Sequence, residues 1–264
     1  MKVVDLSDDL KDLFCLCLED WSVDARESGP KRRQWLDRCQ QHGGLRAKIA
    51  MDDDGVPGGF IQYGPIEQSM VDGSGLYFVY CIFVHGHRKG RGDFQKRGMG
   101  KALLAAAEED ARLLGARGMA AWGLWLPFWM RASWFRAHGY RKADRQGMSD
   151  LMWKPFVESA EPPRWFPKER KLPEPIEGKV NVTAFSRGWC LAQNLTFERA
   201  KRAAAEFGDK VSFREVDTSS RDAVSEWGYS DDVLVDGRSL QKGPPPSYEK
   251  IRRSIAKRVA KLGK

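Results

Sequence analysis

The sequence predicts an α/β protein of two domains, and three observations lead to this fold class. Segments with strand periodicity and segments with amphipathic-helix periodicity both occur before and after a proline-rich stretch. Five of the 13 prolines fall within residues 158–178, and proline interrupts both helices and central strands. The chain has 264 residues, and a domain has about 100–200. We therefore expect a first domain over residues 1–157, a linker over 158–178 and a second domain over 179–264.

In the first domain, we expect helices followed by a sheet and further helices. The expected helices cover residues 6–21, 31–42, 101–114 and 131–138, and the expected strands cover residues 45–51, 58–65, 76–84 and 118–122. The turn residues 52–55 join two of these strands as a hairpin. Residues 76–84 are apolar on both faces, which indicates a central buried strand. Gly115 and Gly139 end two of the helices.

In the second domain, the pattern is strand, helix, strand, strand and helix. These elements are expected over residues 179–186, 190–207, 211–217, 232–236 and 249–262. The βαβ start indicates a smaller α/β layer. The last helix is basic and has an apolar stripe. We expect it to close the domain with its Lys and Arg in water, the alternative being that they attract nucleic acid or an acidic partner.

Charge is unevenly distributed along the sequence. The 44 Lys and Arg exceed the 36 Asp and Glu by 8. Residues 85–101 and 248–264 carry net charges of +5 and +6, so the remainder sums to −3. Because the basic residues are local, we do not expect nucleic acid as a partner.

The sequence shows no membrane span and no secretory signal. The longest apolar run, residues 76–84, has nine residues, and a transmembrane helix needs about 20. The N-terminus lacks the apolar stretch of a signal peptide. Five cysteines without a C-x-x-C pair indicate a reducing compartment. We therefore expect a cytoplasmic protein without a membrane partner.

Residues 84–101 form the segment most indicative of chemistry, because a glycine-rich loop here joins a buried strand to a helix. Gly98 and Gly100 let the backbone turn tightly and bring its N–H groups close to a ligand. The helix that follows directs its positive end to the same place, and cationic side chains surround it. The segment predicts a phosphate or pyrophosphate site, the alternative being a solvated basic loop. It fits neither the P-loop nor the dinucleotide fingerprint.

This segment resembles the GNAT family of acetyl-CoA-dependent N-acetyltransferases. The family's hallmark is a strand ending in Val, a loop of the form Q/R-x-x-G-x-G/A, and a helix. Here these are Ile82-Phe83-Val84, then Gln95-Lys96-Arg97-Gly98-Met99-Gly100, then a helix opening at Lys101. The resemblance implies a mixed sheet with flanking helices and acetyl-CoA as co-substrate.

The resemblance also implies which residues bind this co-substrate. It assigns Ile82, Phe83 and Val84 to the pantetheine arm and residues 95–101 to the pyrophosphate. The loop before Gln95 is longer than is usual in the family. Its extra cations are expected either to contact the 3′-phosphate of CoA or to be solvated: His85, His87, Arg88, Lys89 and Arg91.

A second stretch, residues 131–140, resembles the family signature A-x-x-x-Y/F-x-x-x-G-F/Y. Many members carry a Tyr four residues before the Gly, and this Tyr is proposed to reprotonate the CoA thiolate. This sequence has Phe135 there, and Phe128 replaces the usual Asn seven residues earlier. Solvent or an acid elsewhere must then supply the proton.

Transfer to an amine also requires a neutral nucleophile, and a general base contributes about 10²–10⁴-fold. Candidates near the central strand are Tyr80, Glu67 and His85, of which we name Tyr80 and His85 as catalytic residues. Tyr80 is alternatively a core residue, and His85 a phosphate contact or an exposed residue. The aromatic residues within 122–130 are expected to line either the acceptor pocket or the core. No metal is expected.

In the second domain, Cys190 is placed at the first turn of a helix that follows a strand. A helix N-terminus favours a thiolate, which makes Cys190 a redox candidate, the alternative being a structural role. The topology is similar to thioredoxin-like domains, but Gln193 replaces the second cysteine of C-x-x-C. The tandem arrangement resembles the YoaP-like acetyltransferases.

These observations favour an enzyme that moves an acetyl group from acetyl-CoA to a primary amine of a small molecule or a protein. Two alternatives stay open: a non-catalytic acyl-CoA-binding or thiol-redox sensor, and a nucleic-acid-binding adaptor that uses the two basic stretches.

Overall fold

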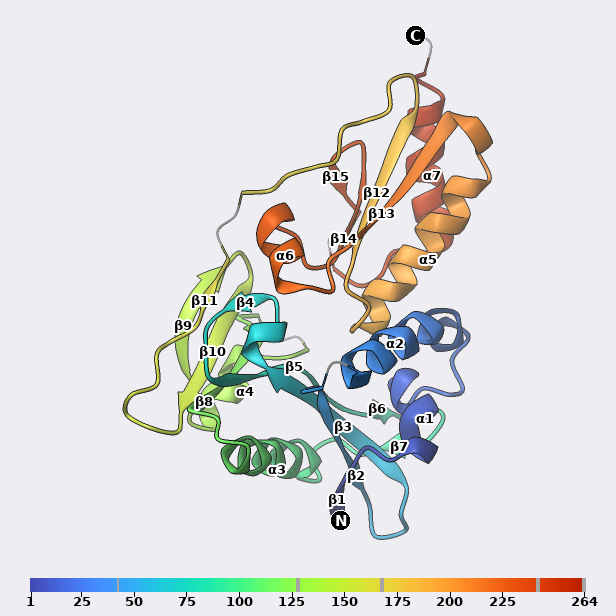
Figure 1. Cartoon of the computed structure of the whole chain (residues 1–264). Coiled ribbons are helices and arrows are strands. Elements are labelled where there is room, and N and C mark those ends of the chain that lie inside the picture. The colour runs from blue at the N-terminus through green and yellow to red at the C-terminus, as the bar shows by residue number, and fades with distance from the viewer. Residues whose placement is uncertain (42, 127–128, 167–168, 241–242, 263–264) are drawn as a thin grey trace. The chain divides into compact units, whose positions relative to one another are not determined.

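The computed structural model describes residues 1–41, 43–126, 129–166, 169–240 and 243–262. The chain divides into two compact units (Figure 1), residues 1–21 with 36–166 and residues 22–35 with 167–264. The first holds a large mixed sheet flanked by helices, and the second a smaller sheet with helices of its own. The predicted α/β fold class is therefore confirmed. Among the described residues, every helix is too short or too polar to cross a bilayer.

Seven strands form the large sheet, in the order β1-β2-β3-β5-β8-β10-β9. Their bounds are β1 (Lys2–Asp5), β2 (Arg46–Met51), β3 (Pro57–Pro65), β5 (Leu76–Val84), β8 (Gly118–Leu124), β9 (Arg141–Gln146) and β10 (Ser149–Pro155). Neighbouring strands pair antiparallel except for β5 and β8, which are parallel. Two short ribbons accompany the sheet, β4 (Val71–Asp72) with β11 (Arg164–Trp165) and β6 (Gly86–His87) with β7 (Gly92–Asp93).

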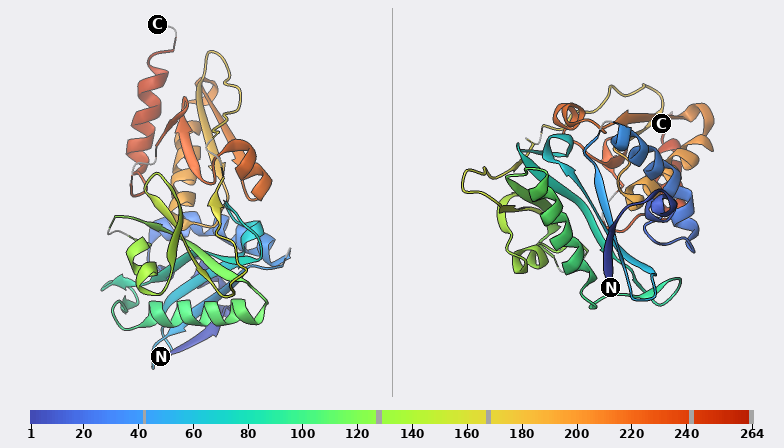
Figure 2. Two further views of the ribbon diagram at one scale, coloured as in Figure 1. Left: turned by 90° about the vertical axis from the view of Figure 1, so that its left-hand side faces the viewer. Right: turned by 60° about the horizontal axis from the view of Figure 1, so that its bottom comes forward.

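Helices α1 (Lys11–Cys15) and α3 (Met99–Leu113) cover opposite faces of this sheet. The Phe14 ring of α1 packs edge-on against Phe60 of β3, with 5.1 Å between centroids. The adjacent Ile61 belongs instead to the core cluster that includes Leu103 and Ala107 of α3. Successive side chains of a strand point to opposite faces, which separates the two helices. Figure 2 (right) shows α3 lying along one face, and α4 (Ala132–Ala137) adds Phe135 to the same cluster.

Two predicted helices differ from the structure. The helix expected over residues 6–21 is reduced to a 3₁₀ turn, Asp8–Leu10, and to α1, because Cys17 and Leu18 adopt positive φ angles of 51° and 61°. The helix expected over residues 31–42 begins earlier, as α2 (Val23–Gln41), with Pro30 inside it. Its expected last residue, His42, lies outside the described residues.

The second unit has a four-stranded sheet in the order β13-β12-β14-β15. Its elements are β12 (Val180–Ser186), α5 (Leu191–Ala205), β13 (Val211–Asp217), α6 (Arg221–Trp227), β14 (Asp232–Val235), β15 (Arg238–Ser239) and α7 (Tyr248–Val259). β12 pairs parallel with β13 and antiparallel with β14. Phe197 of α5 and Ile251 and Ile255 of α7 enter one core cluster with the sheet.

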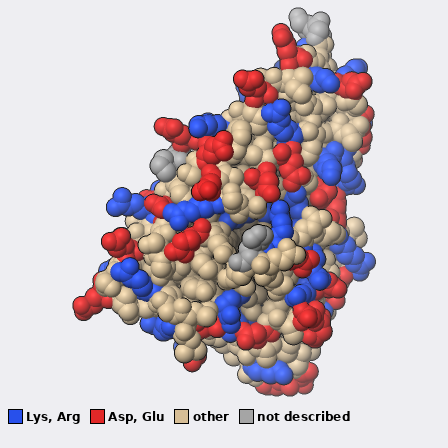
Figure 3. Space-filling model, viewed as in Figure 1, with Lys and Arg blue, Asp and Glu red and all other residues tan. Residues whose placement is uncertain are grey.

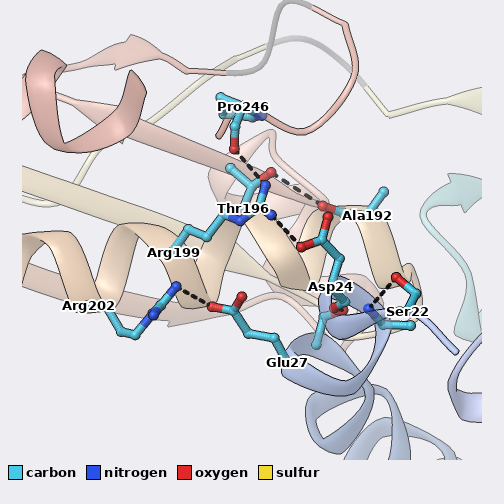
Figure 4. A network of polar contacts seen from close by, with 10 residues as sticks. Ser22, Asp24, Glu27, Ala192, Thr196, Arg199, Arg202 and Pro246 are labelled. Atoms are coloured by element: carbon cyan, nitrogen blue, oxygen red, sulfur yellow. Dashed lines mark hydrogen bonds and ion pairs between the residues drawn. The ribbon is translucent and has the colours of Figure 1, made fainter. Parts of the chain in front are cut away.

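The first part of α2 belongs to the second unit, where it is held to α5 by polar contacts (Figure 4). Arg199 donates to Asp24 at 2.7 Å and to the Pro246 carbonyl at 3.0 Å, and Arg202 pairs with Glu27 at 2.7 Å. The division between the units thus falls within α2, whereas the sequence placed residues 22–35 in the first domain. The domain boundaries at 157 and 179 stay a prediction.

Candidate functional site

Two parallel strands diverge in the middle of the large sheet. β5 and β8 pair only from Leu76 with Gly118 to Val79 with Ala121. Both strands then continue, β5 to Val84 and β8 to Leu124. Among the described strands, none pairs with this edge of β5 beyond Val79. The result is a fork that opens toward the end of β5.

A β-bulge in β5 marks the start of the fork. Gln62 of β3 pairs with Cys81, and the next residue, Tyr63, pairs with Val79. Tyr80 is therefore the extra residue in the ladder, and such a residue bends a strand and increases its twist. Trp122 of β8 closes the base of the fork, because its Nε1 donates to the Tyr80 carbonyl at 2.8 Å.

Beyond the bulge, the backbone of β5 presents polar groups to the open fork. The His85 N–H, just after β5, donates to the Gly58 carbonyl of the neighbouring strand β3 at 2.9 Å. In an antiparallel ladder, every second residue directs its N–H and C=O away from the partner strand. Ile82 and Val84 therefore direct their main-chain groups to the edge that β8 has left.

The N-terminus of α3 lies beside this edge. Gly98 caps the helix with a φ of +85°, which favours glycine. The first main-chain bond into the helix runs from Ala102 to the Gly98 carbonyl, at 3.0 Å. The N–H groups of Met99, Gly100 and Lys101 thus precede the helical bonding pattern and are available to an anion. The first turn of α3 contains no acidic residue.

Between these elements lies a cleft of about 750 Å³. It is lined by residues of β5, of the loop into α3 and of the segment leading into α4: Ile82, Phe83, Val84, Phe94, Gln95, Lys96, Gly98, Met99, Gly100, Lys101, Trp129, Met130, Arg131, Ser133, Trp134 and Phe135. Three of these described residues are cations, Lys96 and Lys101 on one wall and Arg131 on the other, and none is a carboxylate. The cleft therefore suits a long ligand with negative charge.

The structure brings together nearly all of the cofactor residues that the sequence predicts. Ile82, Phe83 and Val84 line the cleft with the loop residues, and only Arg97 does not. Its guanidinium lies 5.3 Å from the centroid of the Phe94 ring. A Cβ on Gly100 would lie 3.4 Å from Trp134, so glycine keeps the cleft open at this point.

The extra cations of the long loop are directed elsewhere. His87 lies 3.6 Å from Glu19, Arg91 pairs with Asp20 at 2.9 Å, and the Lys89 ammonium lies 5.0 Å from the Trp21 ring. None of the five basic residues between Val84 and Gln95 is among the residues described as lining the cleft. Their contacts hold the β6–β7 ribbon to residues 19–21.

The two predicted catalytic residues, Tyr80 and His85, also lie outside the lining of the cleft. The Tyr80 hydroxyl donates to the Gln68 carbonyl at 2.9 Å, and its ring is buried. His85 is fully buried, with Nδ1 2.7 Å from the Gly92 carbonyl and Nε2 3.4 Å from the Trp21 indole nitrogen. Both side chains thus have polar contacts within the protein. Their catalytic role stays a prediction.

The second signature provides part of the opposite wall. Phe135 is fully buried against the cleft and carries no hydroxyl. The sequence did not single out Arg131, Ser133 and Trp134 as lining residues, although their place in the signature was a usable signal. In the aromatic segment before α4, Trp129 lines the cleft and Trp125 is exposed. Phe128 lies outside the described residues.

In the second unit, Cys190 is the N-cap of α5 and is buried. It forms no disulfide within the described chain. The surrounding loop is fixed by Trp189, whose Nε1 donates to Asp231 at 2.9 Å, and by Asn194, which donates to the Gly188 carbonyl at 2.9 Å. Burial limits the access of a thiol substrate to Cys190.

Comparisons with known proteins concern the first part of the chain. Solved structures that resemble it include PaiA N-acetyltransferase from Thermoplasma acidophilum in complex with coenzyme A, at 18% identity and a TM-score of 0.44, covering 59% of this chain and 100% of that one. A putative GNAT-family acetyltransferase from Desulfovibrio desulfuricans has 20% identity and a TM-score of 0.43, covering 59% and 99%. A GNAT-family acetyltransferase from Brucella melitensis in complex with acetyl-CoA has 16% identity and a TM-score of 0.41, covering 62% and 94%.

No curated protein matches the sequence. Residues 8–124 match the model of the acetyltransferase (GNAT) family. This range contains the fork, the glycine loop and α3. The match supports a GNAT acetyltransferase domain in the first part of the chain.

Proposed function

We propose that the first unit transfers an acetyl group from acetyl-CoA to a primary amine of a small molecule or a protein. One observation carries the proposal: a single cleft joins the open edge of β5 to the N-terminus of α3. The strand edge suits the amide-containing pantetheine arm, and the helix N-terminus suits the pyrophosphate. The family match supports the same co-substrate.

In the proposed reaction, the neutral amine attacks the thioester carbonyl, a C–N bond forms and the C–S bond breaks. The main-chain N–H groups of Ile82 and Val84 face the fork, where they can polarise the carbonyl as the oxyanion develops. The amine loses one proton and the CoA thiolate gains one. Because Phe135 has no hydroxyl, we propose that solvent protonates the thiolate.

The proposal is tested by calorimetric titration with acetyl-CoA and by following CoA release with a panel of amines. Gly100→Val places a branched side chain against Trp134 and Val84, where even a Cβ is already within 4 Å. We expect this variant to lose at least ten-fold in acetyl-CoA affinity. Ala105→Val, at an exposed position on the same helix, is the control and should bind like the wild type. Equal affinity of all three proteins would remove the basis of the proposal.

A non-catalytic acyl-CoA sensor is a second candidate, because the binding elements are present while Phe135 occupies the position of the family's usual acid. Saturable binding of acetyl-CoA without CoA release for any amine would favour the sensor. We further propose that the second unit is thioredoxin-like, which its β13-β12-β14-β15 order supports. The burial of Cys190 favours a structural role for this cysteine over a redox role.

A further inference from the structure

Four exposed basic residues, called the row below, follow one another along α7 and the turn after it. Lys250, Arg253, Lys257 and Lys261 are exposed and follow one another at intervals of three, four and four residues. Lys250, Arg253 and Lys257 lie within α7, where at 100° per residue they fall within about 60° of arc and span about 10 Å at 1.5 Å per residue. Lys261 lies in the turn that follows the end of the helix. Ile251 and Ile255, which face the core, lie on the other side of the helix. Figure 2 (left) shows α7 along one margin of the second unit.

The row differs from its neighbours in how its charges are compensated. On the same helix, Arg252 pairs with Glu206 at 2.5 Å and Arg258 with Asp236 at 3.2 Å. On α5, Arg199 and Arg202 are paired as well. Within the described part of the chain, the four residues of the row have no acidic partner. The flanking cations thus contribute to the fold, whereas the four residues of the row make no such ion pair and leave their charged groups in water.

The row is a local feature of the surface. On the face drawn in Figure 3, basic and acidic side chains are interspersed. Glu249 is the only acid of α7 and lies in its first turn, where it favours the helix dipole. Four like charges at these intervals repel one another and cost a few tenths of a kcal/mol per adjacent pair. A binding partner that carries negative charge relieves this repulsion.

The chemistry of α7 separates the classes of anionic partner. A membrane-surface helix inserts its apolar face into the lipid, but Ile251 and Ile255 are committed to the core. Protein interfaces depend on aromatic and other large anchors and are depleted in Lys. The side chains beside the row are Glu249, Ser254, Ala256, Arg258 and Ala260, and none of them is a large apolar anchor. A phosphodiester backbone needs cations in a line and no apolar anchor.

From these observations, we infer that the row on α7 binds the phosphodiester backbone of a nucleic acid without reading its sequence. This surface lies in the second unit and does not depend on the cleft of the first. The inference departs from the expectation based on net charge, because net charge does not tell which cations are already paired.

The salt dependence of binding is the quantitative expectation. Four neutralised phosphates give a slope of about −3.6 in log Kobs against log salt for duplex DNA, and about −2.8 for a single strand. Affinity for a duplex should then fall by about 150-fold between 50 and 200 mM salt. Fluorescence anisotropy with labelled 20-residue single-stranded RNA, single-stranded DNA and duplex DNA measures both slopes.

The test compares two variants of the full chain that have the same net charge. The first replaces the row: Lys250→Gln, Arg253→Gln, Lys257→Gln and Lys261→Gln. The control replaces four exposed, scattered cations: Lys2→Gln, Arg136→Gln, Lys142→Gln and Lys210→Gln. Each lowers the net charge from +8 to +4. Gln has nearly the helix propensity of Lys and Arg, and circular dichroism confirms that both variants fold.

We expect the row variant to lose at least ten-fold in affinity at 50 mM salt and most of its salt slope, while the control keeps both within two-fold. Equal losses in the two variants would show that net charge alone attracts the probe and would overturn the inference. Poly-glutamate or anionic phosphatidylserine vesicles that bind as tightly as the nucleic acids, with the same loss in the row variant, would also overturn it. A wild type that binds no nucleic acid at 50 mM salt rejects the inference outright.

Discussion

At the scale of single residues, His85 shows how contacts specify a role that sequence leaves open. The Gly92 carbonyl can only accept, so Nδ1 must carry the proton. The Trp21 indole can only donate, so Nε2 must be the acceptor. The two contacts thus fix the orientation of the ring, with both nitrogens in use. The sequence predicted a base or a phosphate contact at this position, and no sequence pattern indicates the partners of a buried histidine.

His85→Phe keeps an aromatic ring at this position but removes both ring nitrogens and their polar contacts. It leaves the Gly92 carbonyl and the Trp21 N–H without their partner, which costs about 1–3 kcal/mol for buried groups. We expect the free energy of unfolding in urea to fall by this amount, with acetyl-CoA affinity within two-fold of the wild type. Unchanged stability together with loss of CoA release would instead support the predicted catalytic role.

Arg131 is the cation on the wall of the cleft opposite α3, and the loop cations that the sequence offered for the 3′-phosphate of CoA do not reach the cleft. Arg131→Gln should weaken acetyl-CoA binding by about five-fold, since an exposed charged contact contributes about 1 kcal/mol. We expect Arg131 to contact the 3′-phosphate. Acetyl-3′-dephospho-CoA, which lacks this phosphate, should therefore bind the wild type and this variant alike. Arg136→Gln, in the helix that Arg131 precedes and outside the cleft, serves as the control in calorimetry. A five-fold loss with both ligands would place Arg131 on another group of the cofactor.

At the scale of elements, local signals were predictable and tertiary ones were not. The glycine loop and α3 follow from glycine, helix periodicity and charge within a few residues, and the structure has them where the sequence predicts them. β1, β9 and β10 were not predicted. β1 and β9 are short edge strands, and the polar Arg141–Gln146 lacks an apolar pattern of its own. β10 lies between β8 and β9, and its apolar run is only three residues long. The β6–β7 ribbon depends on contacts with residues 19–21, far away in the sequence.

α3 is fixed to the sheet by Asp110. The Tyr63 hydroxyl donates to Asp110 at 2.6 Å, and Arg46 and Lys48 lie beside the same carboxylate. Burial raises the pKa of Tyr63, so the hydroxyl keeps its proton at neutral pH. Asp110→Ala should lower the free energy of unfolding by about 2 kcal/mol, because a half-buried cation and a buried hydroxyl lose their partner. The exposed Glu109→Ala is the matched control in urea denaturation, and equal stability of the two variants would contradict this role.

At the scale of the whole molecule, the proline-rich stretch predicts a linker between two domains, but proline marks a change in the chain and not the contacts made by distant segments. Residues 22–35 lie early in the sequence, yet their partners are in the second unit: Asp24 with Arg199, Glu27 with Arg202, and Lys31 over the Phe197 ring at 3.7 Å. Hydrophobic periodicity predicts a helix here and does not indicate what the helix packs against.

A truncated chain of residues 1–166 tests this organisation. It lacks α5, so the first half of α2 loses its partners, and we expect trypsin to cleave rapidly after Lys31, Arg32 or Arg33. The same bonds should be protected in the intact chain, where Arg32 is buried. Limited proteolysis followed by mass spectrometry measures both rates. Equal protection would support the first domain as the sequence drew it, over residues 1–157.

The surplus residue in β5 has a consequence for how this architecture can change over time. Deleting Tyr80 alone would make the pairing of β5 with β3 regular. β5 and β8 could then form hydrogen bonds along their whole length. Such a sheet would be more regular and would have no open fork to bind an extended ligand. The presence of the fork therefore depends on one extra residue in β5 and not only on the side chains around it.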